Sequence, residues 1–167
     1  MDKIILIGFM GAGKTTIGKV LAKRLHIPFV DTDERIESQQ KREIRDIFAK
    51  EGETYFRALE TQQLEQLKTK KEKMVVSVGG GLPVQPQNHE LLKQLGHTIY
   101  LKAEKKTLVR RLSGDSRRPL LQGGSLEKKI EELMFEREAV YEKVADRVVL
   151  TDNKSVNEVV DELIKSI

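Results

Sequence analysis

The chain of 167 residues contains no cysteine, and none of its apolar runs approaches the length of a membrane span. The first absence excludes disulfides, cysteine-ligated metals and thiol catalysis, and it is compatible with a cytoplasmic location. The second predicts no membrane association, and we expect no signal peptide. A concentrated basic patch is also missing: the net charge is only +4, and basic and acidic residues alternate along helical stretches. We therefore expect no nucleic-acid partner.

The composition indicates a folded chain, with 38% hydrophobic and 34% charged residues. Its length suits one domain spanning residues 1–167. Short apolar strands alternate with amphipathic helices, which is typical of a parallel sheet covered by helices. The expected strands are Lys3–Ile7, Pro28–Asp31, Met74–Val78, Thr98–Leu101 and Arg147–Leu150.

Three helical stretches are predicted with defined ends. The first is Lys14–Leu25, and the second is Glu34–Leu67 with interruptions at Gly52 and around residues 41–42. The last begins at a capping box of Ser155 and Glu158 and carries an apolar stripe that reaches Ile167.

The segment from Gly8 to Thr15 matches the pattern G-x-x-x-x-G-K-[ST] without a mismatch, between a predicted strand and a predicted helix. Its glycines allow a tight turn whose N–H groups point at phosphate oxygens, and the helix adds the positive end of its dipole. Lys14 would approach the β- and γ-phosphates, and the hydroxyl of Thr15 can bind Mg²⁺. The motif therefore predicts that a nucleotide binds here, without choosing between kinases, GTPases and ATP-driven machines.

Two carboxylates, Asp31 and Asp33, follow the second predicted strand. Residues one apart at a strand end project to the same side, so one could serve Mg²⁺ while the other holds a substrate hydroxyl. Either could instead cap the helix before Glu34. The strand Met74–Val78 lacks the terminal Asp of switch ATPases and runs into Gly79–Gly81, where three glycines favour close approach of backbone to a ligand.

Two further regions contain arginines. Leu112–Ser125 is a long stretch rich in glycine and charge, and loops of this kind commonly carry function. It holds Arg118, directly after Arg117. By contrast, helix patterning alone favours ordinary surface positions for Arg57 and Arg137.

Six motifs in order make the chain resemble the shikimate kinase family over its whole length. They are GFMGAGKTT at Gly8–Thr16, DTD at Asp31–Asp33, EGExYFR at Glu51–Arg57, SVGGG at Ser77–Gly81, RRPLL at Arg117–Leu121 and RExxY at Arg137–Tyr141. The resemblance implies ATP-dependent phosphorylation of the 3-hydroxyl of shikimate in aromatic amino-acid biosynthesis. It also implies Mg²⁺ as the cofactor, shikimate and ATP as the ligands, and a monomer.

The resemblance also assigns roles. ATP would contact Gly11, Ala12, Gly13, Lys14, Thr15, Thr16, Arg111 and Arg118. Asp31 would hold Mg²⁺ through water, beside Thr15. Shikimate would contact Asp33, Arg57, Gly79, Gly80, Gly81 and Arg137, with the arginines on its carboxylate. Lys14, Asp33 and Arg118 would be catalytic; whether Asp33 removes the hydroxyl proton or only orients the hydroxyl stays open, as does a share for Arg117.

The fold expected from these observations is α/β, with three layers and a five-stranded parallel sheet of order 2-3-1-4-5. The substrate-binding segment would be about residues 33–60 and the lid about residues 112–125. Another small-molecule kinase on this scaffold, for gluconate or a nucleoside monophosphate, is the nearest alternative. A nucleotide-dependent regulator is the alternative from a different class.

Overall fold

The computed structural model describes residues 2–113, 121 and 124–167, so Arg117, Arg118 and most of the predicted lid lie outside the described residues. Its sheet has five strands in the order β2-β3-β1-β4-β5, and every neighbouring pair is parallel. This arrangement confirms the predicted sheet. The strands are β1 (Lys3–Ile7), β2 (Phe29–Asp31), β3 (Val75–Ser77), β4 (Gly96–Lys102) and β5 (Arg147–Leu150).

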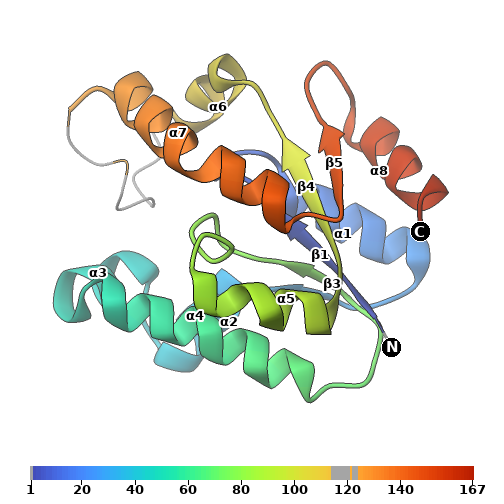
Figure 1. The fold of residues 1–167 in the computed structure, drawn as a ribbon, viewed down its shortest axis with the longest axis horizontal. Helices are drawn as coiled ribbons and strands as arrows, with labels where there is room; N and C mark the ends of the chain where they lie inside the picture. Colours follow the sequence, from blue (N-terminus) through green and yellow to red (C-terminus); the bar gives the residue numbers. More distant parts are fainter. Residues whose placement is uncertain (1, 114–120, 122–123) are drawn as a thin grey trace.

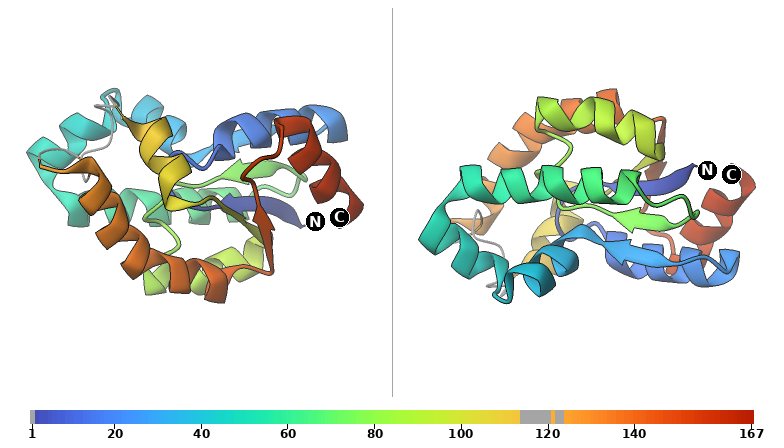
Figure 2. Two further views of the ribbon diagram at one scale, coloured as in Figure 1. Left: turned by 90° about the horizontal axis from the view of Figure 1, so that it is seen from above. Right: turned by 90° about the horizontal axis from the view of Figure 1, so that it is seen from below.

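Helices cover both faces of the sheet, which confirms the three layers (Figures 1 and 2). One face packs against α1 and α8, and the other packs mainly against α4, α5, α6 and α7. The helices are α1 (Lys14–Leu25), α2 (Thr32–Gln40), α3 (Ile44–Glu51), α4 (Glu53–Lys68), α5 (His89–Leu95), α6 (Lys105–Leu112), α7 (Leu126–Val144) and α8 (Val156–Lys165). Among the described residues, none of these helices is long and apolar enough to cross a membrane.

The central strand β1 shows why the sheet must be covered twice. All of its residues are buried. Ile4 and Leu6 belong to the core beneath α1 and α8, whereas Ile5 and Ile7 belong to the core on the opposite face. Because side chains alternate along a strand, a continuous apolar run supplies both cores at once.

The long predicted helical stretch is three helices, interrupted where the sequence indicated. The break after α2 has Lys41 at φ 54°, and the break after α3 has Gly52 at φ 86°, both in the left-handed half of backbone space. These three helices enclose a small core of their own around Ile36, Ile47 and Phe56. The short helices therefore form a packed unit beside the sheet.

The end of the last helix differs from the prediction. The capping box of Ser155 and Glu158 is formed, but α8 ends at Lys165. Ile167 lies beyond that end and is 47% exposed, so extending the apolar stripe to it was wrong. The backbone N–H groups of Ser166 and Ile167 donate only three residues back, to Leu163 and Ile164, so the chain leaves the α-helical repeat on which the apolar stripe depends.

Candidate active site

The loop between β1 and α1, residues 8–13, has the backbone that a phosphate-binding turn requires, and we call it the phosphate loop. Gly8, Gly11 and Gly13 have φ of 152°, 83° and 92°, which residues with a side chain rarely adopt. At Gly8 a Cβ would also lie 2.6 Å from the carbonyl oxygen of Leu101. The Lys14 amino group donates to the carbonyls of Gly8, at 2.7 Å, and Phe9, at 3.0 Å. The Lys14 amino group therefore lies against the first two residues of the loop.

The first turn of α1 favours an anion. Its N-cap is Gly13, no side chain among the described residues caps it, and the first turn holds no acidic residue. The N–H groups and the positive end of the helix dipole thus face the loop. Thr15 and Thr16 follow in this turn, where Thr15 is half-buried and Thr16 is exposed. This geometry suits the binding of a phosphate group.

Asp31 is the last residue of β2, and the two oxygens of its carboxylate accept different hydrogen bonds. Its Oδ1 accepts hydrogen bonds from the backbone N–H groups of Asp33 and Glu34, so it is the N-cap of α2. Its Oδ2 accepts a hydrogen bond from the Thr15 hydroxyl at 3.0 Å. The capping interpretation and the metal-site interpretation are therefore compatible, because each uses a different oxygen of one carboxylate.

The run Gly79–Gly81 follows β3, and a charged side chain fills the space beside each glycine. A Cβ at Gly79 would lie 2.8 Å from an Asp33 carboxylate oxygen, and one at Gly80 would lie 3.1 Å from Arg137 Nη1. A Cβ at Gly81 would overlap the guanidinium of Arg57. The loop therefore gathers the predicted acceptor-binding side chains from α2, α4 and α7 in one place.

Arg57 is held from two sides on α4. Its Nη1 donates to Glu60 Oε1 at 2.7 Å, and its Nη2 lies 3.1 Å from Glu53 Oε2. Glu60 is fully buried, and this desolvation raises the pKa of its carboxyl to about 7 against the opposing attraction of Arg57. Its Oε2 has no hydrogen-bond partner among the described residues. Glu60 thus fixes the position of Arg57, although its own carboxyl is only partly ionised near neutral pH.

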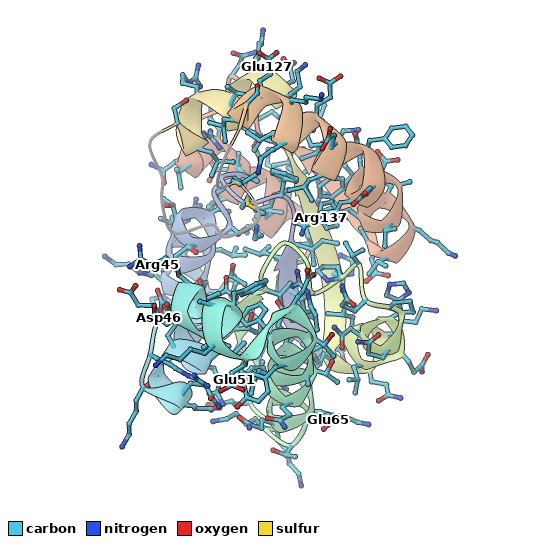
Figure 3. All side chains as sticks on the ribbon, turned by 90° about the vertical axis from the view of Figure 1, so that its left-hand side faces the viewer. Arg45, Asp46, Glu51, Glu65, Glu127 and Arg137 are labelled. Atoms are coloured by element: carbon cyan, nitrogen blue, oxygen red, sulfur yellow. The ribbon has the colours of Figure 1, made fainter. Side chains whose placement is uncertain are left out.

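Arg137 lies on the inner side of α7, between that helix and the α3–α4 pair (Figure 3). It is 5% exposed, and its guanidinium lies 5.8 Å from the ring centroid of Phe9 in the phosphate loop. Its Nη1 has no hydrogen-bond partner in the part of the chain that the structure describes. A buried donor of this kind is costly unless an acceptor arrives, and a carboxylate is the matching acceptor.

The surface positions that helix patterning favoured for Arg57 and Arg137 are therefore wrong. Arg57 is 8% exposed and Arg137 is 5% exposed, because each side chain points at Gly79–Gly81 and away from solvent. Periodicity on one helix cannot show that a glycine loop from another element leaves space for a guanidinium.

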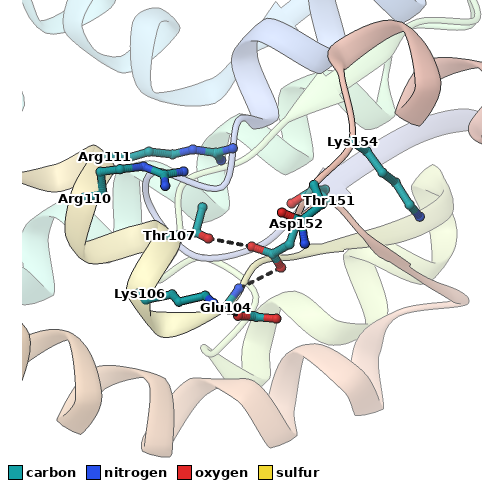
Figure 4. A pocket seen from close by; sticks show the side chains of 9 residues that line it. Glu104, Lys106, Thr107, Arg110, Arg111, Thr151, Asp152 and Lys154 are labelled. Atoms are coloured by element: carbon teal, nitrogen blue, oxygen red, sulfur yellow. Dashed lines mark hydrogen bonds and ion pairs between the residues drawn. The ribbon is translucent and has the colours of Figure 1, made fainter.

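A third region lies beyond the phosphate loop. Arg111, at the end of α6, is exposed and donates to the carbonyl of Gly11 at 3.0 Å. It lines a cavity of about 460 Å³ between α6 and the loop that follows β5 (Figure 4). Asp152 of that loop accepts from the Thr107 hydroxyl and from the backbone N–H of Glu104, which ties the loop to α6. A group joined to the phosphates through a short linker would reach this cavity.

Sequence reasoning missed several residues that the site contains. Glu60, Tyr141 and Asp152 were given no role, although Tyr141 belonged to a quoted motif. A signal existed for Glu60, since it lies three residues after Arg57, where helical side chains meet. For Asp152 no local signal existed, because its partners are about 45 residues away.

Comparisons with a family model, with curated relatives and with solved structures all find the same kind of enzyme. A family model described as shikimate kinase matches residues 10–167. A shikimate kinase of Thioalkalivibrio sulfidiphilus is 46% identical over 97% of this chain and 85% of its own. A solved shikimate kinase of Acinetobacter baumannii, in complex with shikimate, has a TM-score of 0.94 at 37% identity, covering 99% of this chain and 92% of its own.

A gluconokinase of Sinorhizobium meliloti has a TM-score of 0.63 at 16% identity, covering 98% of this chain and 90% of its own, a likeness that shows the fold alone. The nearest alternative thus shares the scaffold without sharing the sequence. Match length, identity and the assembled glycine loop all point to one group of enzymes, and the chain belongs to the shikimate kinase family.

Proposed function

We propose that this chain transfers the terminal phosphoryl group of ATP to the 3-hydroxyl of shikimate, giving shikimate 3-phosphate and ADP in aromatic amino-acid biosynthesis. The observation that carries the proposal is a cluster of side chains beside the phosphate loop. We call this cluster the acid pocket, because it would receive the carboxylic acid group of the acceptor. There, two buried arginines and the Asp33 carboxylate surround Gly79–Gly81. A small ring with one carboxylate and several hydroxyls matches this set of groups.

The nucleotide end of the reaction uses the phosphate loop and α1. We propose that Gly11, Ala12, Gly13, Thr15 and Thr16 bind the phosphates of ATP together with Lys14. Arg111 would line the path to the nucleoside, which would occupy the cavity in Figure 4. Lys14 would balance charge that develops on the transferred group.

The Thr15 hydroxyl and the Asp31 carboxylate fit Mg²⁺, because both offer hard oxygen ligands within 3.0 Å of each other. No cluster of three or more His, Cys, Asp or Glu side chains within the described ranges could hold a metal ion. Phosphate oxygens and water would therefore supply most ligands, with Asp31 acting through water. When bound, Mg²⁺ would neutralise charge on the phosphates.

The acceptor end uses Arg57 and Arg137 for the carboxylate and Asp33 for hydroxyls. With the carboxylate held, the 3-hydroxyl oxygen attacks the γ-phosphorus, and the bond between that phosphorus and the β–γ bridging oxygen breaks. Asp33 orients the hydroxyl, and its carboxylate is the acceptor for the proton that leaves. Gly79–Gly81 let the acceptor lie against backbone where Cβ atoms would otherwise stand.

Several further assignments stay predictions. Arg118 would neutralise the transferring group from a lid of about residues 112–125, and closure would keep water from accepting the phosphate. The acceptor-binding segment would be about residues 33–60. We also propose a single domain that works as a cytoplasmic monomer.

The proposal is tested by ADP release from ATP and Mg²⁺ with shikimate, gluconate or a nucleoside monophosphate as acceptor. Strong stimulation by shikimate alone is expected. Stimulation by gluconate or a nucleoside monophosphate instead would retain the nucleotide site and overturn the acceptor. No stimulation by any of them would favour a nucleotide-dependent regulator.

A further inference from the structure

Tyr141 is buried on α7, one turn after Arg137, and no step proposed above uses it. Its hydroxyl donates a hydrogen bond to the carbonyl of Gly80. The guanidinium of Arg137 lies beside the same hydroxyl, and both groups flank the position that a Gly80 Cβ would occupy, at 3.1 Å and 3.4 Å. One hydroxyl therefore contacts both the glycine loop and an arginine of the acid pocket.

The ring and the hydroxyl of Tyr141 have different surroundings. The ring packs in the main core against Tyr100, with ring centroids 5.1 Å apart. Burial raises the pKa of the hydroxyl to about 12, so it remains protonated at any working pH and can always donate. Packing alone would be satisfied by phenylalanine, which leaves the hydroxyl without a role in the core.

The two groups that Tyr141 joins come from distant parts of the chain. Gly80 follows β3, and its carbonyl is 61 residues from Tyr141 in sequence. Arg137 lies on α7 itself, and its planar fork binds a carboxylate well only when its orientation is fixed. A bond from α7 to the glycine loop fixes the distance between Arg137 and the backbone against which the acceptor lies.

We propose that Tyr141 is a positioning residue for the acceptor's carboxylate: its hydroxyl holds the Arg137 guanidinium and the Gly80 backbone in the relative position that the carboxylate requires. The inference rests on the proposed function, because it takes shikimate as the acceptor. Tyr141 itself need not touch the acceptor.

Tyr141→Phe removes the hydroxyl and keeps the ring. The KM for shikimate should rise about tenfold, since a partly buried carbonyl and a buried guanidinium lose a fixed partner. The KM for ATP and the kcat should change less than about twofold, because the phosphate loop is untouched. Tyr100→Phe is the matched control, since it removes a hydroxyl from the neighbouring ring, near Glu138 and Lys102, and should leave all three constants unchanged.

A ligand without the charged group locates the effect. Isothermal titration with shikimate and with its methyl ester gives the affinity that each protein gains from the carboxylate. That gain should be about tenfold smaller in Tyr141→Phe than in the wild type. An equal gain in both proteins, or a KM that changes no more than in Tyr100→Phe, would overturn the inference and leave Tyr141 a packing residue.

Thermal melting separates folding from positioning. If Tyr141→Phe is not folded at the assay temperature, Gly80→Ala places a methyl group between the hydroxyl and the guanidinium, and the same titrations decide. A wild type that does not use shikimate would instead refute the proposed function, so the two failures are distinguishable.

Discussion

Two glycine-rich loops follow neighbouring strands of the sheet, and they need glycine for opposite reasons. In the loop after β1, Gly8, Gly11 and Gly13 have positive φ, so the backbone conformation itself disfavours residues with a side chain. In Gly79–Gly81, after β3, none of the glycines has a positive φ. These glycines are required for space, because charged side chains occupy the positions of their missing Cβ atoms.

The difference separates the two ends of the reaction. In the proposed reaction the first loop would bind phosphate with its own N–H groups and with Lys14, so its function would be nearly complete within one stretch of sequence. The second loop supplies little by itself, and its function depends on side chains from three helices. Substitutions in the two loops should therefore affect different substrates, and the following experiments test that division from the largest expected effect to the smallest.

Lys14→Ala should lower kcat by about a thousandfold, because the main positive charge of the first loop is lost. The affinity for shikimate, measured by titration, should change less than about threefold, since Lys14 is not in the acid pocket. Lys19→Ala is the matched control, an exposed lysine on the same helix. Unchanged turnover in a folded Lys14→Ala variant would remove Lys14 from the mechanism.

Asp33→Asn should lower kcat by about a hundredfold or more, because the amide cannot accept the hydroxyl proton. The affinity for ATP with Mg²⁺ should remain, whereas Asp31→Asn should weaken it. Titration with ATP and Mg²⁺ distinguishes the two variants. If Asp33→Asn loses ATP affinity instead, the roles of the two aspartates must be exchanged.

Gly81→Ala should raise the KM for shikimate about thirtyfold, because the new Cβ displaces the guanidinium of Arg57. The protein should stay folded, since the displaced group is the end of a flexible side chain. Gly80→Ala should have a smaller effect, because its nearest contact, Arg137 Nη1, is 3.1 Å away. A raised KM for ATP in either variant would break the division between the loops.

Glu60→Gln tests the electrostatics of the acid pocket through pH. The folded pKa of Glu60, about 7, lies above its ordinary 4.5, so folding favours the protonated carboxyl. Its stabilising contribution is therefore present below about pH 4.5 and is lost as the pH rises towards 7.

The unfolding free energy of the wild type minus that of Glu60→Gln should therefore fall by roughly 3 kcal/mol across this window. The charged groups that face Glu60 are Arg57, Asp33 and Arg137, and all of them remain in the variant. Chemical denaturation at several pH values measures the difference. A difference that rises with pH would show that the attraction of Arg57 outweighs the desolvation of Glu60.

The sequence predicted the sheet order from the alternating elements and the family resemblance taken together, and it predicted β1, α1 and β5 to the residue from local pattern. Strand ends were less accurate: β4 begins at Gly96, two residues before its predicted start, because pairing with Lys3 extends it. Arg57 and Arg137 were misplaced on the surface when helix patterning was used alone. Burial of a charged side chain depends on partners that the helix itself does not contain.

The sequence by itself determined the phosphate loop, since positive φ at its glycines, the lysine and the following helix are all local properties of one segment. Only the tertiary structure decided the acid pocket. Glu60 becomes hard to ionise, Tyr141 meets Gly80 and Arg137 loses contact with water because segments far apart in sequence exclude solvent together. Desolvation is a property of the assembled fold, and no single stretch of the chain encodes it.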